Sequence, residues 1–187
     1  WTSEGEITPR GLEPQRFESI NKLLISSGKR RRVTFHADEV ELADGHREPK
    51  LAMVQDPASH YIQLAYMALL KPETLTVGGT LSMPLAWTKK QDTVTYDIEA
   101  RETLDTPLGK IDTFRLKPRP LAGQKEKDKE KEEVLAEIWI APSLQYLPIR
   151  MLLRQGKANY VDMKMDKMPQ QAAAPATRAL PLPPPEK

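Results

Sequence analysis

The feature that most constrains this chain is a run of two-residue alternation between Val134 and Met168, which reads VLAEIWIAPSLQYLPIRMLLRQGKANYVDMKMDKM. Apolar and polar residues alternate through much of it, which is the period of a strand with one buried face. A helix needs apolar residues three or four positions apart. Residues 141–143 (APS) and 155–157 (QGK) interrupt the run, since proline cannot donate to a sheet and glycine suits a tight turn. The stretch therefore predicts three successive antiparallel strands.

The last of these strands, residues 158–166, places Val161, Met163 and Met165 on one side and polar residues on the other. The strand before it, residues 148–155, alternates in a similar way. We therefore expect each strand to be half buried, with its apolar side against a core.

Period-two patterns also occur earlier in the chain, and they predict strands over residues 32–37, 39–42, 80–87, 94–101 and 113–117. Pro84 predicts that its strand lies at an edge or carries a bulge, because proline lacks the N–H that a central strand donates. The last two of these strands are expected to pair as a hairpin with one wet face. Residues 1–20 are expected to be largely extended, with Phe17 and Ile20 as buried anchors, and residues 22–29 to form a strand end or hairpin.

One helix is expected over residues 56–70, because Asp56 suits an N-cap and Pro57 suits the first helical position. Six apolar residues recur at steps of three and four and predict one buried face: Ala58, Tyr61, Ile62, Ala65, Tyr66 and Leu69. Further residues of the helix are also apolar, so we expect a sheet to cover most of its circumference. The sequence therefore predicts a mainly β protein, built as a strongly curved antiparallel sheet or open half-barrel with helix 56–70 packed on the concave side.

The 187 residues suit a single β-rich domain over residues 1–168. Residues 119–133 contain QKEKDKEKEE, whose alternating charges favour a solvated loop, with a helix held by Lys–Glu pairs as the alternative. Residues 169–187 are rich in proline and alanine and are expected to form a disordered or polyproline II tail, or else a segment that a partner recognises. No apolar run reaches the roughly 20 residues that a membrane helix needs.

Composition and motifs point away from several chemistries. A net charge of +2 with mixed signs gives no argument for nucleic acid. The four cations at 29–32 predict a solvated strand start, with an anionic-headgroup site as the alternative. The chain has no cysteine, and His36, His46 and His60 fall on different predicted elements without metal-ligand spacing. No G-x-S-x-G or phosphate-loop motif occurs. We therefore expect a non-enzymatic protein with no catalytic residue, no metal and no cofactor.

Three segments of the chain resemble a known family. They are SEGEITPRGLEP near the start, DTPLGKIDTFRL and EIWIAPSLQYLPIR, and their most specific parts are 137–139, 146–150, Gly109 and Phe114. Together they resemble DUF3108, a family of uncharacterised proteobacterial proteins, over most of residues 1–168. Its members are usually exported and usually carry strands before the SEG segment. The resemblance implies a periplasmic or envelope location and a missing N-terminal portion, and it implies no activity.

We expect a lipid-like or other hydrophobic ligand to bind in a cavity between sheet and helix, by analogy with lipoprotein carriers of similar shape. The apolar helix and the adaptable methionines motivate this expectation. The residues expected to line the cavity are Tyr61, Ile62, Tyr66, Leu69, Met83, Met151, Met163 and Met165. A solid core is the alternative for the same residues. The alternative function is a structural or protein-interaction module of the bacterial envelope, and an enzyme with its site in the barrel mouth carries the least weight.

Overall fold

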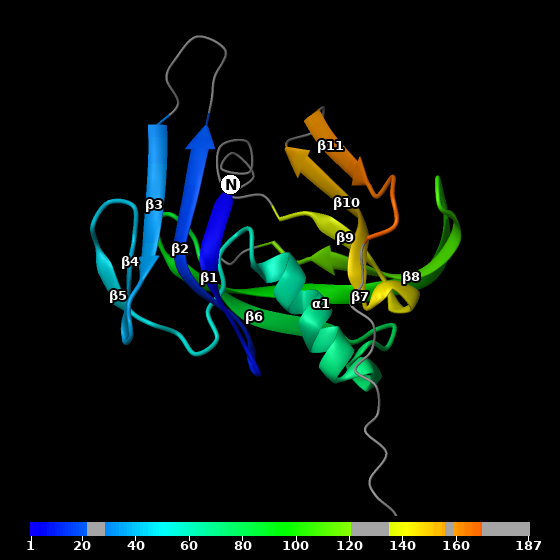
Figure 1. The fold of residues 1–187 in the computed structure, drawn as a ribbon, viewed down its shortest axis with the longest axis horizontal. Helices are drawn as coiled ribbons and strands as arrows, with labels where there is room; N and C mark the ends of the chain where they lie inside the picture. The colour runs from blue at the N-terminus through cyan, green and yellow to red at the C-terminus, as the bar shows by residue number, and fades with distance from the viewer. Residues whose placement is uncertain (22–28, 121–134, 156–158, 170–187) are drawn as a thin grey trace, which may run out of the picture.

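The computed structural model describes residues 1–21, 29–120, 135–155 and 159–169. Within these ranges the chain forms eleven strands and one α-helix, and the strands make two antiparallel sheets (Figure 1). The prediction of a mainly β protein with one helix is confirmed. The strands are divided between two sheets instead of one, and neither sheet closes into a barrel within the described ranges. The expected features at 22–28, in the charged segment from 121 and in the tail from 170 lie outside the described residues.

The two sheets follow each other along the chain. The five-stranded sheet contains β1 (Thr2–Thr8), β2 (Gly11–Asn21), β3 (Lys29–Phe35), β4 (Glu39–Glu41) and β5 (Arg47–Pro49), in that order. The six-stranded sheet contains β6 (Thr80–Ala86), β7 (Gln91–Thr106), β8 (Gly109–Pro118), β9 (Glu137–Ala141), β10 (Leu147–Gln155) and β11 (Asn159–Lys164), also in chain order. Between the sheets come α1 (His60–Leu70) and the 3-10 turn η1 (Pro72–Thr74), and η2 (Pro142–Leu144) joins β9 to β10.

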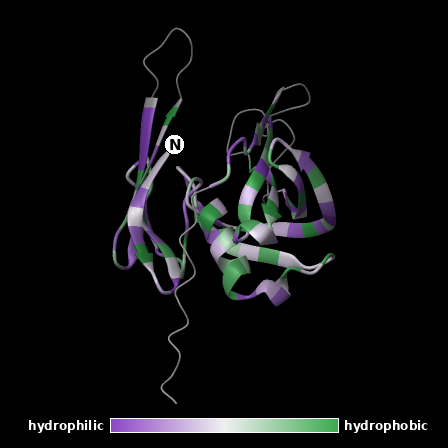
Figure 2. Cartoon of the chain, turned by 45° about the vertical axis from the view of Figure 1, so that its right-hand side comes forward, coloured by the Kyte–Doolittle hydropathy of each residue, from purple (hydrophilic) through white to green (hydrophobic). Residues whose placement is uncertain are grey.

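The three strands predicted between residues 134 and 168 are present as β9, β10 and β11. β10 pairs antiparallel with both of its neighbours. In this register Met151 of β10 lies between Ile138 of β9 and Met163 of β11. Figure 2 shows hydrophobic and hydrophilic bands alternating along the strands, as a sheet with two different faces requires. β11 forms one edge of the six-stranded sheet, since no other described strand pairs with its outer side.

β6 forms the opposite edge, in agreement with the prediction drawn from Pro84. The carbonyl oxygen of Pro84 accepts a hydrogen bond from the N–H of Gln55 (3.0 Å), and the N–H of Ala86 donates to the carbonyl of Gln55 (2.8 Å). Gln55 therefore adds one bridge to this edge without forming a strand. The predicted hairpin is also present, as β7 and β8.

α1 begins at His60, four residues later than predicted. Residues 57–59 form a turn instead, and Asp56 holds this turn. Its Oδ1 atom accepts hydrogen bonds from the N–H groups of Ala58 (2.8 Å) and Ser59 (2.9 Å). Asp56 therefore supplies the capping that the sequence predicts, but to the turn that leads into the helix.

The buried face of α1 differs from the predicted one. Leu64 and Ala68 have no exposed surface and lie against the six-stranded sheet together with Tyr61. Ile62 and Leu69, which we expected to be buried, are each 47% exposed. A helix lying on one sheet buries only a stripe of its surface, so apolar residues outside that stripe stay exposed. The expectation that the sheet covers most of the circumference is wrong for this flank.

A separate apolar core lies under the five-stranded sheet. Phe17 and Val33 are buried there and pack with Val54 and Ala86, of which Ala86 belongs to β6. Phe17 is thus the buried anchor that the sequence predicts, whereas Ile20 is 42% exposed. Three positions separate the two residues, so they lie on opposite faces of β2. The packing at Val54 and Ala86 joins the two sheets.

Two buried glutamines, Gln63 of α1 and Gln55 beside β6, fasten the β1–β2 hairpin to the rest of the fold. The N–H of Leu12 donates to Oε1 of Gln63 (2.8 Å), and the carbonyl of Leu12 accepts from Nε2 of Gln55 (2.8 Å). Both glutamine side chains are almost fully buried. The pairing of β3 with β2 extends only as far as Arg16 of β2, so the glutamines satisfy backbone groups that no strand reaches.

Candidate functional site

The interface between α1 and the six-stranded sheet is a packed apolar core. Its sheet residues are Leu81, Met83, Leu85, Val94, Tyr96, Ile98, Leu116, Ile138 and Ile140. Of the residues expected to line a cavity, Tyr61 and Met83 are buried in this core, and Met151 packs against it. The structure therefore brings these three side chains together, as parts of the core between helix and sheet.

A set of buried polar groups crosses this core and holds α1 in place. The N–H of Ala136 donates to the hydroxyl of Tyr61 (3.0 Å), and Nε2 of His60 lies 3.1 Å from the hydroxyl of Tyr96. Burial raises the pKa of Tyr61 to about 12 and the pKa of Tyr96 well above its ordinary value, and burial lowers the pKa of His60 to about 4. All three side chains are therefore neutral at pH 7, and one hydrogen bond joins Nε2 of His60 to the Tyr96 hydroxyl. These bonds join α1 to β7 and to the segment before β9.

The ionisable groups at the start of α1 have structural roles. Nδ1 of His60 lies near the carbonyl groups of Asp56 and Pro57, without a hydrogen bond of normal geometry. Asp56 is also fully buried, and its Oδ2 atom accepts a hydrogen bond from the hydroxyl of Ser3 (2.5 Å) in β1. A general base has to reach a proton on a substrate, and His60 has no exposed surface. The histidine and the aspartate therefore fasten the helix and β1.

The apolar inner face of the six-stranded sheet, on which α1 packs, continues beyond the helix. Met151 and Leu153 of β10 pack against the core, and their partners in β11 are Met163 and Val161. Cross-strand partners point to the same face, so Val161 and Met163 also lie on the inner face. There they are 52% and 46% exposed. We call these four residues the uncovered end of the inner face.

Ile62 and Leu69 form a second exposed apolar strip, on one flank of α1. They are seven residues apart and therefore lie on the same side of the helix. His60 contacts β7, and Tyr61, about 100° further round the helix, contacts the segment before β9. Another step of about 100° in the same direction places Ile62 on the flank of the helix toward β9 and β10. The helix also contacts β10, and Figure 1 shows α1 in front of this sheet. The strip thus lies on the flank nearer the uncovered end.

The last two predicted cavity residues lie elsewhere. The hydroxyl of Tyr66 donates to the carbonyl of Pro9 (2.8 Å), in the turn between β1 and β2. Met165 packs against an apolar cluster that includes Trp139 and Leu152, on the opposite face of the sheet. The predicted strand runs to residue 166, but β11 ends at Lys164, and beyond that point the alternation no longer fixes the side on which a residue lies.

The cavity residues predicted from the sequence include Met163 but not Val161 or Leu153. Val161 could have been found from the alternation of its strand, because it lies on the same side of that strand as Met163. The alternation does not show where the helix stops covering the sheet. That boundary depends on the position of α1 across the strands, which non-local contacts determine.

The outer face of the six-stranded sheet carries a charged and aromatic cluster that the sequence analysis did not predict. The guanidinium of Arg150 lies over the ring of Trp139 at 4.4 Å, and that of Arg115 lies 5.6 Å from the same ring. Arg115 also pairs with Glu137, which raises the pKa of Arg115. Arg150 donates two hydrogen bonds to Asp162, at 2.9 and 3.0 Å. These contacts tie β8, β9, β10 and β11 together across the sheet.

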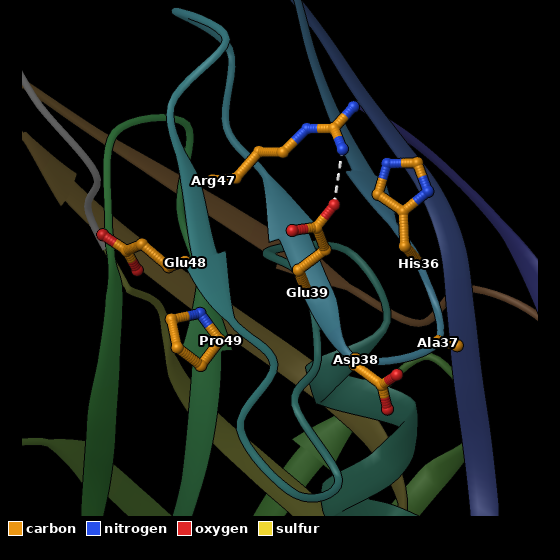
Figure 3. Close-up of a pocket in the computed structure, with 7 residues that line it drawn as sticks. All are labelled: His36, Ala37, Asp38, Glu39, Arg47, Glu48 and Pro49. Carbon is orange, nitrogen blue, oxygen red and sulfur yellow. Dashed lines mark hydrogen bonds and ion pairs between the residues drawn. The ribbon is translucent and has the colours of Figure 1, made fainter.

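A shallow polar pocket lies beside β4 and β5 (Figure 3), and it is lined by His36, Ala37, Asp38, Glu39, Arg47, Glu48 and Pro49. Arg47 donates to Glu39 (2.5 Å) and to Glu41 (2.8 Å), and these bonds raise its pKa. Glu48 accepts from the backbone N–H of Gln91 (3.0 Å). Arg47, Glu39 and Glu48 of this pocket are thus engaged with neighbouring residues of the fold, which leaves them weakly suited to hold a charged ligand.

Two further searches of the described residues gave negative results. No three histidine, aspartate or glutamate side chains in them come together as a metal site. None of the helices in this part of the chain has the length and apolar character needed to cross a membrane.

Comparison with known proteins gives one match. The family model described as protein of unknown function (DUF3108) matches residues 1–161. Neither the curated proteins nor the solved structures contain a match to the chain. Since the family model covers most of the 187 residues, this chain belongs to the DUF3108 family of proteins of unknown function.

Proposed function

We propose that this protein is a non-enzymatic, periplasmic or envelope-associated binding protein that holds the apolar part of a lipid-like ligand against the uncovered end of the inner face. The observation that carries the proposal is the half-exposure of Val161 and Met163 on the sheet face against which α1 packs. Single exposed apolar residues are common, whereas a group drawn from neighbouring elements is typical of binding surfaces. Exported relatives, which the family resemblance implies, support the proposed location.

The proposal assigns a carrier-like architecture to the six-stranded sheet, in which the sheet acts as an open half-barrel and α1 occupies its concave side. The ligand then lies beside the helix, between Leu69 and Met163. Each buried methylene group contributes about 0.8 kcal/mol, so an acyl chain that buries half of about ten methylenes gains roughly 4 kcal/mol. That corresponds to an affinity of about 1 mM, so a second contact has to supplement the acyl chain.

The test combines native mass spectrometry and lipid extraction of the purified protein with titration of a fluorescent fatty acid. Met163→Glu and Leu69→Glu place charges at the site and are expected to weaken fatty-acid binding about tenfold or more. Ile7→Glu is the matched control, because Ile7 is 86% exposed on β1, in the other sheet. Absence of copurified lipid together with equal fatty-acid binding by all three variants would contradict the proposal.

A second candidate function is a structural or protein-interaction module of the envelope. The observation that favours it is the open edge of β11, to which an extended segment of another protein can add a strand. The test compares the proteins recovered by the full chain, by a chain that ends at residue 168 and by the Lys164→Pro variant. Loss with the proline variant assigns binding to the edge, and loss on truncation assigns it to the tail. Identical recovery in all three would contradict this function.

A further inference from the structure

The outer edge of β11 presents backbone groups to its surroundings. The N–H of Met165 donates to the carbonyl of Ile149 (2.9 Å), in the register that pairs β10 with β11. Alternate residues of an antiparallel strand point their N–H and C=O groups to opposite sides. The backbone groups of Tyr160, Asp162 and Lys164 therefore point away from β10, and no other described strand pairs with them.

The side chains of β11 are complementary to a second copy of the same strand. Asp162 and Lys164 are two positions apart and share the outer face, with Met163 between them on the inner face. When two β11 strands pair antiparallel about Met163, each Asp162 lies opposite the Lys164 of the other copy. Opposite charges at such positions stabilise a strand pair, whereas pairing centred on Asp162 would oppose two aspartates. Charge therefore selects one register.

We propose that two copies of this chain associate through β11, with the two-fold axis at Met163, so that their six-stranded sheets join into one continuous sheet. The apolar inner face continues across the axis, where Met163 meets its counterpart and Val161 of each copy lies on the same face. Hydrogen bonds from Arg150 hold the Asp162 carboxylate in a fixed position for this contact. The inference uses the same edge as the second candidate function, but it requires neither a ligand nor another protein.

The expected dimer is weak. A single strand pair buries less surface than the 1,200–2,000 Å² typical of a stable interface, so we expect association at roughly micromolar to millimolar concentrations. Sedimentation velocity of the full chain from about 1 μM to about 1 mM measures it over that range.

The Lys164→Glu variant tests the register. It places a glutamate opposite Asp162 of the other copy, and we expect it to weaken association about tenfold or more. Lys167→Glu is the matched control, because it makes the same change in charge beyond the end of β11 and is expected to leave association unchanged. Equal association of both variants with the wild type would assign dimerisation to another surface and would overturn the proposal.

Hydrogen exchange measured residue by residue provides a second readout. The amides of Tyr160, Asp162 and Lys164 are expected to be protected at high protein concentration and to exchange rapidly on dilution. A chain that stays monomeric throughout, or one whose edge amides stay protected as a monomer, would overturn the proposal. Lys164→Glu keeps Val161 and Met163 in place, so fatty-acid binding by this variant separates the two ideas. In the wild-type chain, fatty-acid binding without self-association refutes only the dimer, and self-association without fatty-acid binding refutes only the ligand site.

Discussion

Nε2 of His60 lies 3.1 Å from the hydroxyl of Tyr96, and neither side chain has any exposed surface. The contact joins α1 to β7, the strand beside the β6 edge of the six-stranded sheet. Burial keeps the imidazole neutral at pH 7, and protonation would place a charge inside the apolar core. The position of the helix therefore depends on the protonation state of one histidine.

Stability is expected to fall as the pH drops from 7 to 5. The pKa of His60 is lowered from 6.5 to about 4 by burial, so on acidification the unfolded chain takes up a proton before the folded chain does. The stabilisation is complete above pH 6.5 and is lost as the pH falls toward 4. Linkage gives a loss of about 2 kcal/mol in the free energy of unfolding between pH 7 and pH 5. Urea unfolding followed by circular dichroism at several pH values measures it.

His60→Gln is the control for this pH effect. Glutamine offers Tyr96 an acceptor but does not titrate, so the variant should be less stable at pH 7 and nearly independent of pH down to 5. Carboxylates such as Asp97 and Asp162, whose pKa values are lowered by hydrogen bonds from Arg119 and Arg150, titrate below this window. A loss of stability as large in the variant as in the wild type would remove His60 as the cause.

Gly11→Ala is expected to destabilise the fold by about 2–4 kcal/mol. Gly11 has φ of +118°, and an added Cβ would lie 2.3 Å from Oε1 of Gln63, which already accepts from the N–H of Leu12. Gly45→Ala is the matched control, since Gly45 also has positive φ (+87°) but no atom within 4 Å of the new Cβ. The control should cost only the backbone strain, about 1 kcal/mol. Equal losses in chemical denaturation would show that Gln63 does not constrain Gly11.

The strands and the helix could be predicted because their signals are local. Alternation at every second residue specified β7 to β11, and Pro84 specified an edge. The division into two sheets could not be predicted, because every strand pairs with a neighbour along the chain and the alternation does not show that β5 and β6 stay unpaired with each other. Gln55 and Gln63 illustrate the difficulty: they are polar, yet they are buried because β3 does not reach Leu12.

The candidate site could be predicted only in part, for a related reason. Met163 followed from the alternation of its strand, and its exposure follows from the place of β11 beyond the cover of the helix. Tyr61 and Met83 were expected beside it but belong to the packed core. A helix with apolar residues on most sides gives no internal signal for the stripe that meets the sheet.

Leu64→Ala and Leu69→Ala form a matched pair that tests which stripe of α1 is buried. Leu64 has 0% exposure and lies in the core, whereas Leu69 is 47% exposed on the flank toward β10. We expect Leu64→Ala to lower the free energy of unfolding by about 2–5 kcal/mol and Leu69→Ala to lower it by less than about 1 kcal/mol. Denaturant titrations compare them directly. The reverse order would mean that the helix is rotated to the face that the sequence pattern alone predicts.

Arg150→Lys is expected to destabilise the outer face although it keeps the charge. The guanidinium of Arg150 bonds both carboxylate oxygens of Asp162 and lies over Trp139 at 4.4 Å, and an ammonium group cannot reproduce the two parallel hydrogen bonds. We expect a loss of about 1–2 kcal/mol in the free energy of unfolding and a rise in the pKa of Asp162, which Arg150 keeps low. Denaturation and an NMR titration of the Asp162 carboxyl group measure the two effects.

The control for this last change is Arg154→Lys, the same substitution at an exposed position of the same strand. Arg154→Lys should change neither the free energy of unfolding nor the pKa of Asp162. Arg154 lies at the exposed end of β10, and the paired hydrogen bonds to Asp162 come from Arg150. If Arg150→Lys and Arg154→Lys have the same effect on stability, the contact of Arg150 with Trp139 contributes nothing beyond the positive charge of the side chain. If only Arg150→Lys has an effect, it should also weaken self-association, because Asp162 is then no longer held in place opposite Lys164 of a second copy.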